Sequence, residues 1–382
     1  MTENGSVGLR PGETADSGLR VAVDMPWDST ARMGTGAYSE TMVRALASVA
    51  PRARIMLIID SNGPCTIRLP NVTYHTPPPV RVRSEGFRQV SLPDMLEKLE
   101  AHCLFAPATL LPTIKPCPMV SAVHDLTAVE HPEYYNTSLA QHLIKWLEPS
   151  IRSADHVIAI SSETREGLRR HFDIPDERVT IIPQPVRDVF LRPLEQERVA
   201  GHLAKLEVRQ PFYFHLSNLA PHKNVRFIVE VLARLREKGM GATPVMVIAG
   251  GVNAPDRPFD FLEYAQTKGL GAAVQYLGPL DDEQVQALYQ RCEAFLFPSL
   301  AEGWGLPVAE ASALGARVLA SPFVPAAHPK QRLSLDVDVW VNALASPVAA
   351  RSPSQPHDAA SAGRALYNVL QHVARRSASV TS

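Results

Sequence analysis

The sequence has no long hydrophobic run. No apolar stretch approaches the roughly 18 residues that a membrane-spanning helix needs, and the first residues carry no basic-then-apolar signal pattern. These two absences argue against a membrane-spanning protein and predict a cytoplasmic location.

Cysteine and net charge are also scarce. The 382 residues include four cysteines and no CxxC pair, so neither a zinc site nor a disulfide framework is expected. The formal net charge is −1, which supplies no strong field for binding nucleic acid. We therefore expect isolated thiols in a reducing compartment and no nucleic-acid partner.

The length and the hydrophobic pattern predict two α/β domains. A chain of 382 residues is too long for one ordinary core. Buried strands are expected where short apolar runs alternate with helical periodicity, at 19–24, 55–59, 103–105, 119–123, 156–160, 179–183, 212–215, 245–249, 274–278, 294–297 and 317–321. The predicted organisation is a disordered leader at 1–18, a first domain at 19–185, a linker at 186–208, a second domain at 209–350, and a helix with a tail at 351–382.

The chain is organised around the stretch 297–311, which reads FPSLAEGWGLPVAEA. The apolar run 294–297 predicts a strand, two glycines predict a turn, and Pro307 suits the first position of a helix. Unpaired amides at a helix N-terminus favour an anion such as phosphate. Glu302 in the loop and Glu310 in the helix can therefore reach the crevice where open α/β folds bind ligands.

Glu302 and Glu310, with seven residues between them and FPS before them, resemble the donor motif of retaining glycosyltransferase family 4. The resemblance implies a GT-B fold, in which two Rossmann-like domains face each other across a cleft and a C-terminal helix crosses back to the first domain. It also implies that Glu302 contacts the donor sugar and that Glu310 binds the ribose. The donor site would include the turn residues Gly303, Trp304, Gly305 and Leu306. The alternative is a surface loop with two solvated glutamates.

Two features of the first half extend this resemblance. His124 and Asp125 follow a predicted strand, and the resemblance implies that His124 approaches the donor sugar while Asp125 positions the imidazole or caps the next segment. Gly34 and Gly36 are expected in a loop before a helix that starts near Tyr38, where backbone would approach the donor diphosphate. The third glycine of a dinucleotide fingerprint is absent, so a plain turn is the alternative.

Lys223 stands just before the helix predicted at 225–238, a suitable place for a cation that contacts phosphate. The family generally has an arginine next to this lysine or a few residues before it, whereas this chain has His222 and Ser217. Neither side chain offers the permanent bidentate fork of arginine. The diphosphate would therefore bind more weakly, or His222 would act while protonated.

The sequence indicates no metal or cofactor. Asp336-Val337-Asp338 has the spacing of a metal motif but lies outside the recognisable donor site. The resemblance implies a metal-independent transfer, in which a helix dipole and Lys223 stabilise the leaving diphosphate.

An arginine-rich stretch lies between two predicted elements of the first domain. It carries Arg68, Arg81, Arg83 and Arg88, with Glu85 as its only acid. A solvated loop is one interpretation. The other is contact with an anionic acceptor or with the inner face of a membrane.

The resemblance implies a hexosyltransferase that uses a nucleotide-diphosphate sugar. The second domain would bind the donor, and the first would bind a glycan, a lipid-linked or a small-molecule acceptor in polysaccharide or glycoconjugate biosynthesis. The sequences HDL and EGWGLP resemble the mannosyltransferase branch, which favours GDP-mannose. A sugar phosphorylase, a nucleotide-sugar epimerase and a degenerate, non-catalytic scaffold of the same fold are the alternatives.

Overall fold

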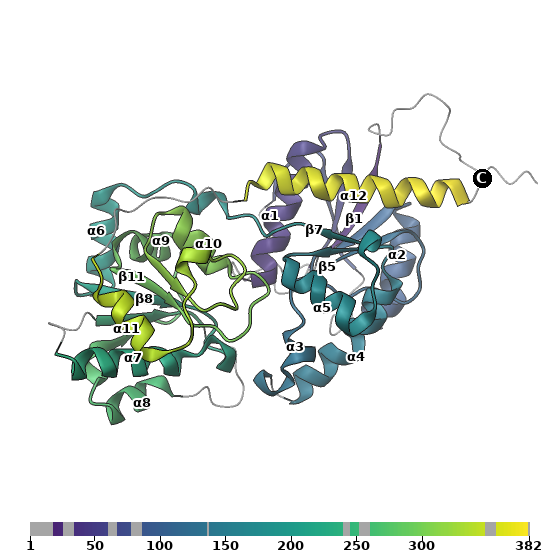
Figure 1. Ribbon diagram of the computed structural model, residues 1–382. Helices are drawn as coiled ribbons and strands as arrows, with labels where there is room; N and C mark the ends of the chain where they lie inside the picture. Colours follow the sequence, from purple (N-terminus) through teal and green to yellow (C-terminus); the bar gives the residue numbers. More distant parts are fainter. Residues whose placement is uncertain are drawn as a thin grey trace, which may run out of the picture. The chain divides into compact units, whose positions relative to one another are not determined.

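The computed structural model describes residues 18–25, 34–59, 67–77, 86–135, 137–239, 245–251, 260–347 and 357–380. They form two compact units (Figure 1). Unit 1 is drawn from Met1–Leu126, Gln141–Pro185 and His357–Ser382, and unit 2 from Thr127–Ala140 and Val186–Pro356. The predicted leader, apart from Gly18, lies outside the described residues.

Unit 1 contains a parallel sheet of seven strands in the order β3-β2-β1-β4-β5-β6-β7. The strands are β1 (Arg20–Asp24), β2 (Arg54–Ile58), β3 (Val72–His75), β4 (Cys103–Ala106), β5 (Met119–Val123), β6 (His156–Ala159) and β7 (Val179–Ile181). Val21 of β1 pairs with Ile55 on one side and with Cys103 on the other. The central strands β4, β5 and β6 are buried along their whole length, which is why they read as continuous apolar runs.

Helices connect and cover these strands. They are α1 (Gly34–Val49), α2 (Leu92–Lys98), α4 (Thr137–Ser153), α5 (Ser162–Phe172) and α12 (Ala359–Val380), with a π-helical turn at Phe87–Ser91 before α2. Only the part of α4 from Gln141 onward belongs to unit 1. The long α12 packs against α1 so closely that a Cβ on Gly363 would lie 2.7 Å from the carbonyl of Ala45. The predicted return of the C-terminal helix to the first domain is therefore observed.

Unit 2 contains a second parallel sheet, of five strands in the order β10-β9-β8-β11-β12. The strands are β8 (Phe212–Leu216), β9 (Val245–Ala249), β10 (Val274–Tyr276), β11 (Ala294–Phe297) and β12 (Val318–Ala320). The chain runs outward from β8 in one direction and from β11 in the other. The junction of β8 and β11 is therefore the topological switch point of this sheet.

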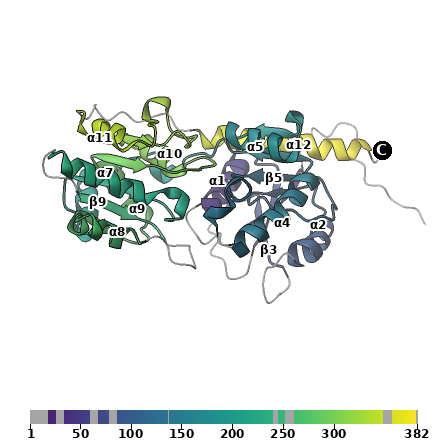
Figure 2. The same cartoon turned by 60° about the horizontal axis from the view of Figure 1, so that its bottom comes forward.

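Helices lie on both faces of the second sheet (Figure 2). Phe214, Phe295 and Phe297 pack against α6 (Gln196–Lys205), α9 (Asp282–Arg291) and α10 (Leu306–Ala313). On the other face, Leu296 packs with Trp340 among residues of α7 (Val225–Glu237), α8 (Phe261–Thr267) and α11 (Val337–Ala345). The alternation of neighbouring strand residues between the two cores explains the unbroken apolar pattern of β11.

Three features differ from the sequence-based organisation. The segment predicted as a linker, 186–208, belongs to unit 2, where it forms a 3-10 turn (Asp188–Phe190) and α6. The residues Thr127–Ala140, predicted within the first domain, group with unit 2 and contain α3 (Thr127–Glu130) and a second 3-10 turn (Pro132–Tyr134). The edge strand β3 was not predicted. No helix among the described residues is long and apolar enough to cross a bilayer.

Candidate active site

The predicted donor residues of unit 2 gather at the switch point of its sheet. The segment after β8 carries Ser217, His222 and Lys223, and the segment after β11 carries Glu302 and the turn that precedes α10. Because β8 and β11 are adjacent and parallel, both segments leave the sheet at the same edge. This edge is where doubly wound folds hold their ligands.

Lys223 and Glu302 form an ion pair at this edge. Nζ of Lys223 lies 2.6 Å from Oε1 of Glu302, and the two side chains are 13% and 11% exposed. The residues that were predicted to bind phosphate and sugar therefore converge on one point. Low exposure limits the screening of this pair by water and salt.

The backbone around Lys223 is fixed by contacts with the segment after β11. The carbonyl of His222 accepts hydrogen bonds from the amide of Leu300 (2.7 Å) and from Oγ of Ser299 (3.1 Å). Asn224 adopts a left-handed conformation with a φ of 55° and donates from Nδ2 to the carbonyl of Pro298 (3.2 Å). These contacts hold the Lys223 ammonium in register with Glu302.

Gly305 shapes the turn that leads into α10. Its φ is 94°, a value that favours glycine, and a Cβ at this position would lie 2.5 Å from Cγ1 of Val324. The helix begins at Leu306, so Pro307 occupies its second position, one residue later than predicted. Gly303 is buried and Trp304 is partly buried in the same turn.

Glu310 is the fifth residue of α10 and is almost fully buried, with its side chain 3% exposed. Its partner is Arg187, whose Nε and Nη2 both lie 3.0 Å from Oε1 of Glu310. Nη1 of Arg187 also donates to Oδ1 of Asp282 at the start of α9 (2.8 Å). Burial raises the pKa of Glu310 to about 7, although the charge of Arg187 and its hydrogen bond act in the opposite direction.

Arg187 was not predicted as a site residue. It lies in the stretch that the sequence indicated was a linker, and 123 residues separate it from Glu310. No local pattern marks such a pair, because the contact depends on how the chain packs α9 and α10 together. The Arg187 guanidinium also stacks over the ring of Phe190, at 4.7 Å from its centre.

His222 is buried and neutral in the free protein. Burial, together with the charge of Lys223, lowers the pKa of His222 to about 3. Among the described residues, its Nδ1 has no hydrogen-bond partner, and the ring of Tyr134, also in unit 2, lies 5.7 Å away. This environment disfavours the expectation that His222 serves as a protonated substitute for arginine.

Ser217 has a structural role in the same loop. Its Oγ accepts a hydrogen bond from the amide of Leu219 (3.1 Å) and lies 2.8 Å from Nε2 of His215. Close packing at this turn also requires Gly250, because a Cβ there would lie 1.7 Å from the carbonyl oxygen of Ser217. The hydroxyl of Ser217 therefore orders the segment that leads to Lys223.

His124 follows β5 in unit 1, as predicted, and is partly buried. Its Nε2 donates to the carbonyl of Pro107 (2.7 Å), and the ring of Tyr38 meets it edge-on with the centres 4.6 Å apart. Burial lowers the pKa of His124. The neutral ring therefore presents Nδ1 as an acceptor, while Asp125 is exposed beside it.

Gly34 and Gly36 do not lie in a loop. Both belong to the first turn of α1, which begins at Gly34, four residues before the predicted start near Tyr38. Gly34 is exposed with a φ of 61°, whereas Gly36 is buried. The preceding residues 26–33 lie outside the described part of the chain. The approach of this backbone to a diphosphate stays a prediction.

Two of the four arginines predicted in a charged loop have partners within unit 1. Nε of Arg88 lies 3.3 Å from Oδ2 of Asp24, and Arg68 donates to the hydroxyl of Tyr74 at 2.8 Å. Arg81 and Arg83 lie outside the described residues. The observed pairing gives no support to a membrane contact through Arg68 and Arg88.

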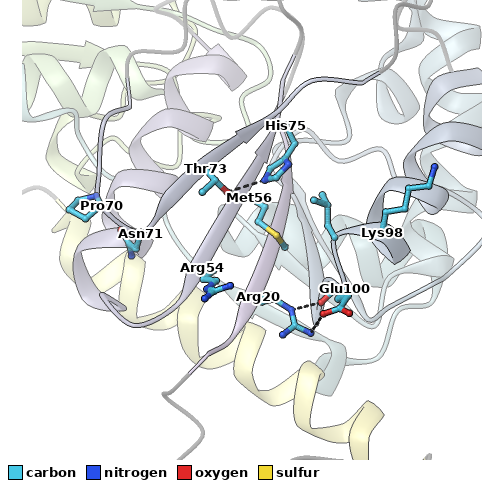
Figure 3. Close-up of a pocket in the computed structure, with 10 residues that line it drawn as sticks. Arg20, Arg54, Met56, Pro70, Asn71, Thr73, His75, Lys98 and Glu100 are labelled. Carbon is cyan, nitrogen blue, oxygen red and sulfur yellow. Dashed lines mark hydrogen bonds and ion pairs between the residues drawn. The ribbon is translucent and has the colours of Figure 1, made fainter. Parts of the chain in front are cut away.

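A separate cavity of about 430 Å³ lies in unit 1 (Figure 3). It is lined in part by Arg20 and Arg54, which begin β1 and β2, and by Lys98 at the end of α2. Nη2 of Arg20 is paired with Oε2 of Glu100 at 3.4 Å. Its described lining includes none of the predicted site residues, so we do not assign it to the active site.

The aspartates of the Asp-x-Asp sequence have structural partners. Asp336 caps α11 by accepting from the amide of Val339 (3.1 Å). Asp338 pairs with Arg234 at 3.0 Å and with Lys238 at 2.8 Å. Within the described ranges, no group of three or more His, Cys, Asp or Glu side chains is arranged to hold a metal ion.

The sequence matches two family descriptions. Residues 93–188 match "Glycosyltransferase Family 4", and residues 204–328 match "Glycosyl transferases group 1". The second match contains Ser217, Lys223, Glu302 and Glu310, and the first contains His124.

Characterised relatives are similar over part of the chain. O-antigen chain mannosyltransferase B of Escherichia coli is 25% identical over 203 residues, which are 53% of this chain and 52% of the relative. The serotype-specific mannosyltransferase WbdA of Escherichia coli is 30% identical over 191 residues, or 50% of this chain and 22% of the relative. A D-inositol 3-phosphate glycosyltransferase of Corynebacterium glutamicum (strain R) is 23% identical over 243 residues, which are 60% of this chain and 58% of the relative. The chain therefore spans about half the length of the first relative and less of the second.

Solved structures share the fold over nearly the whole chain. Anabaena HepE in complex with UDP and glucose aligns with a TM-score of 0.64 at 17% identity, covering 92% of this chain and 99% of that one. Sucrose-phosphate synthase from Thermosynechococcus elongatus aligns with a TM-score of 0.64 at 17% identity, and the alignment covers 95% of this chain and 98% of that one. These similarities establish the GT-B fold that the sequence predicted.

Proposed function

Because the chain belongs to the group 1 and family 4 glycosyltransferases, we propose that it transfers a hexose from a nucleotide-diphosphate sugar to an acceptor hydroxyl with retention of anomeric configuration. The observation that carries this proposal is the Lys223–Glu302 pair at the switch point, with Glu310 one turn into the helix that follows. The cation and the carboxylate are paired in unit 2, and α10 begins at Leu306, shortly after Glu302 in the chain.

The proposed chemistry assigns a role to each of these groups. The Lys223 ammonium leaves Glu302 for the diphosphate, and together with the N-terminus of α10 it stabilises the charge of the leaving group. Glu302 then accepts a hydrogen bond from a hydroxyl group of the donor sugar, and Glu310 accepts one from a hydroxyl group of the ribose. For His124 we propose the role of a neutral hydrogen-bond acceptor for a sugar hydroxyl.

The bonds change on one face of the sugar. The acceptor oxygen forms a bond to the anomeric carbon while the bond from that carbon to the phosphate oxygen breaks. The departing phosphate takes the proton of the acceptor hydroxyl. This scheme differs from the two-carboxylate mechanisms of glycoside hydrolases, because the leaving group itself serves as the base.

The favoured donor is GDP-mannose, supported by two similar proteins that are named mannosyltransferases. The acceptor class we propose is a glycan or a lipid-linked sugar, bound by unit 1, and the reaction is proposed to proceed in the cytoplasm without a metal ion. The side-chain partners of Arg68 and Arg88 offer no support for a peripheral contact with the inner membrane face.

The test is a comparison of donors. Thermal unfolding is measured with GDP, UDP and ADP, and release of each diphosphate from its mannose or glucose conjugate is then followed. A ligand at about 100 times its dissociation constant should add roughly 2.7 kcal/mol of stability. Glu302→Gln should retain the stabilisation and lose the turnover. Absence of stabilisation by all three diphosphates would refute the proposal, and turnover that requires inorganic phosphate would indicate a phosphorylase.

A further inference from the structure

Arg187 lies between two carboxylates from different helices of unit 2. It is the second residue of the segment that begins at Val186, and its side chain is 17% exposed. One end of the guanidinium binds Glu310 of α10, which is 3% exposed, and the other binds Asp282 of α9, which is 26% exposed. Glu310, the more deeply buried of the two carboxylates, depends on Arg187 for its countercharge.

The contact with Glu310 is directional. Nε and Nη2 of Arg187 both approach Oε1 at 3.0 Å. Arg187 thereby leaves the second oxygen, Oε2, for another donor. A guanidinium suits this task because its nitrogens are fixed in one plane and it stays charged at every physiological pH.

We propose that Arg187 is a positioning residue of the nucleotide site, one that holds the buried Glu310 carboxylate ionised and oriented so that Oε2 can accept a ribose hydroxyl. The inference rests on the proposed donor role of Glu310 and adds a residue to which neither the sequence motif nor the family matches assign a function. Arg187 acts through Glu310 and needs no contact with the nucleotide.

The electrostatic surroundings of Glu310 explain why a countercharge is needed. Burial favours the protonated carboxyl, and the negative charge of Asp282 adds to that effect. Tyr289 of α9 is also buried near Glu310, and burial raises the pKa of its hydroxyl well above the usual value, so it carries no charge. Arg187 is therefore the group that opposes protonation of Glu310, whose pKa is about 7 even with this help.

Ionisation matters for the ligand because a carboxylate accepts stronger hydrogen bonds than a neutral carboxyl group. Nucleotide affinity should therefore rise with pH as Glu310 loses its proton. Removing Arg187 should move this rise to higher pH, whereas removing Asp282 should move it to lower pH. A residue that only supported the fold would instead weaken binding by the same factor at every pH.

The experiment measures dissociation constants by calorimetry from pH 6 to 9.5 for the wild type, Arg187→Gln, Arg187→Lys, Asp282→Asn and Glu310→Gln. The probe is GDP, replaced by UDP if GDP does not bind the wild type. Glu310→Gln serves as the reference. It lacks the carboxyl group, so the pH dependence of its binding contains the titration of the ligand's phosphate but not that of Glu310. Circular dichroism and gel filtration establish that each variant is folded before its binding is measured.

We expect Arg187→Gln to weaken binding about fivefold at pH 7, because moving the pKa of Glu310 from about 7 up by about one unit lowers its ionised fraction from about one half to about one tenth. The loss should shrink toward pH 9.5, and Arg187→Lys should recover most of the affinity at pH 7. A loss that is equal at all pH values, or unchanged affinity in Arg187→Gln, would overturn the proposal. If Arg187→Gln does not fold, Asp282→Asn decides the question. A rise of affinity with pH that is not displaced from that of the wild type would then overturn the proposal.

A second measurement separates this inference from the proposed function. Thermal unfolding without ligand is measured as a function of pH. The stability of Glu310→Gln is compared with that of the proteins that retain the carboxyl group, and the difference reports the titration of Glu310. Absence of nucleotide binding at every pH would refute the donor site itself. In that case an upward shift of the Glu310 titration in Arg187→Gln would still demonstrate the charge coupling, and no shift would refute it.

Discussion

Nζ of Lys223 and Oε1 of Glu302 lie 2.6 Å apart, although 79 residues separate them in the sequence. Each side chain balances the charge of the other at the edge of the sheet where β8 and β11 end. A bound donor would offer each group a better partner: phosphate oxygens for the ammonium and sugar hydroxyls for the carboxylate. The free site is therefore neutral where the ligand will bring both negative charge and hydroxyl groups.

Lys223→Ala should weaken nucleoside diphosphate binding strongly. A charge-assisted hydrogen bond contributes about 1.5–3 kcal/mol, which corresponds to a loss of roughly 10- to 150-fold in affinity. Lys268→Ala is a suitable control, because Lys268 pairs with Glu230 on α7 rather than with a site residue. Equal dissociation constants for the wild type and Lys223→Ala, measured by calorimetry at one salt concentration, would contradict the phosphate role.

Glu310→Gln should change how stability depends on pH. The pKa of Glu310 is about 7 in the folded protein, against an ordinary value of 4.5. Because the unfolded chain loses this proton first, the carboxyl stabilises the fold below pH 4.5, and that contribution is lost as the pH rises to 7, by about 3 kcal/mol in total. Urea unfolding is measured at pH 5, 6, 7 and 8. Over this range the free energy of unfolding of the wild type should fall relative to that of the variant. A constant difference would rule out the raised pKa.

His222→Gln should have the opposite effect on the pH profile. The pKa of His222 is lowered to about 3 from 6.5, so the unfolded chain gains a proton on acidification while the folded protein does not. This residue stabilises the fold fully above pH 6.5, and the contribution falls by at most about 1.4 kcal/mol per pH unit as the pH decreases toward 3. Unfolding free energies between pH 7 and 5 should decline less steeply in the variant. Parallel profiles would mean that His222 is accessible to protons.

Diphosphate affinity provides a separate check on His222. A ring that stays neutral contributes no pH-dependent attraction to phosphate. His222→Gln and the wild type should therefore show the same slope of affinity against pH between 6 and 8.5. A steeper slope in the wild type would revive the interpretation that a protonated His222 replaces an arginine.

Gly305→Ala should destabilise the turn before α10. The left-handed φ of 94° and the 2.5 Å approach to Val324 both oppose a Cβ, and we expect a loss of about 1–3 kcal/mol in the free energy of unfolding. Adding Val324→Ala removes the steric clash but not the backbone strain. The double variant should therefore lose less than the sum of the two single changes, and strict additivity would show that no clash existed.

Turnover should persist in EDTA. The proposed leaving-group stabilisation relies on Lys223 and the N-terminus of α10, so removal of divalent cations should change the rate less than twofold. The measurement is diphosphate release with and without the chelator. Loss of activity that only Mg²⁺ or Mn²⁺ restores would show that the proposed mechanism is incomplete.

Much of the fold follows from local sequence. Strands such as β5 and β11 are covered on both faces, so their side chains are apolar without alternation and are recognisable as short runs. Glu302 and Glu310 belong to one continuous strand–turn–helix, so their motif could be recognised directly. The edge strand β3 was missed because its residues after Val72 are partly or fully exposed and its pattern resembles that of a loop.

The properties of the site depend on contacts that the sequence does not encode locally. The burial that makes His222 neutral and raises the pKa of Glu310 exists only after helices and loops have packed around them. The Arg187–Glu310 pair joins residues 123 positions apart, and nothing near either residue indicates the other. The sequence by itself determined the strands other than β3, the two units' α/β character and the donor motif, because these arise from neighbouring residues. Only the tertiary structure decided which side chains are charged and paired, because desolvation and Coulomb interactions depend on distance in space rather than along the chain.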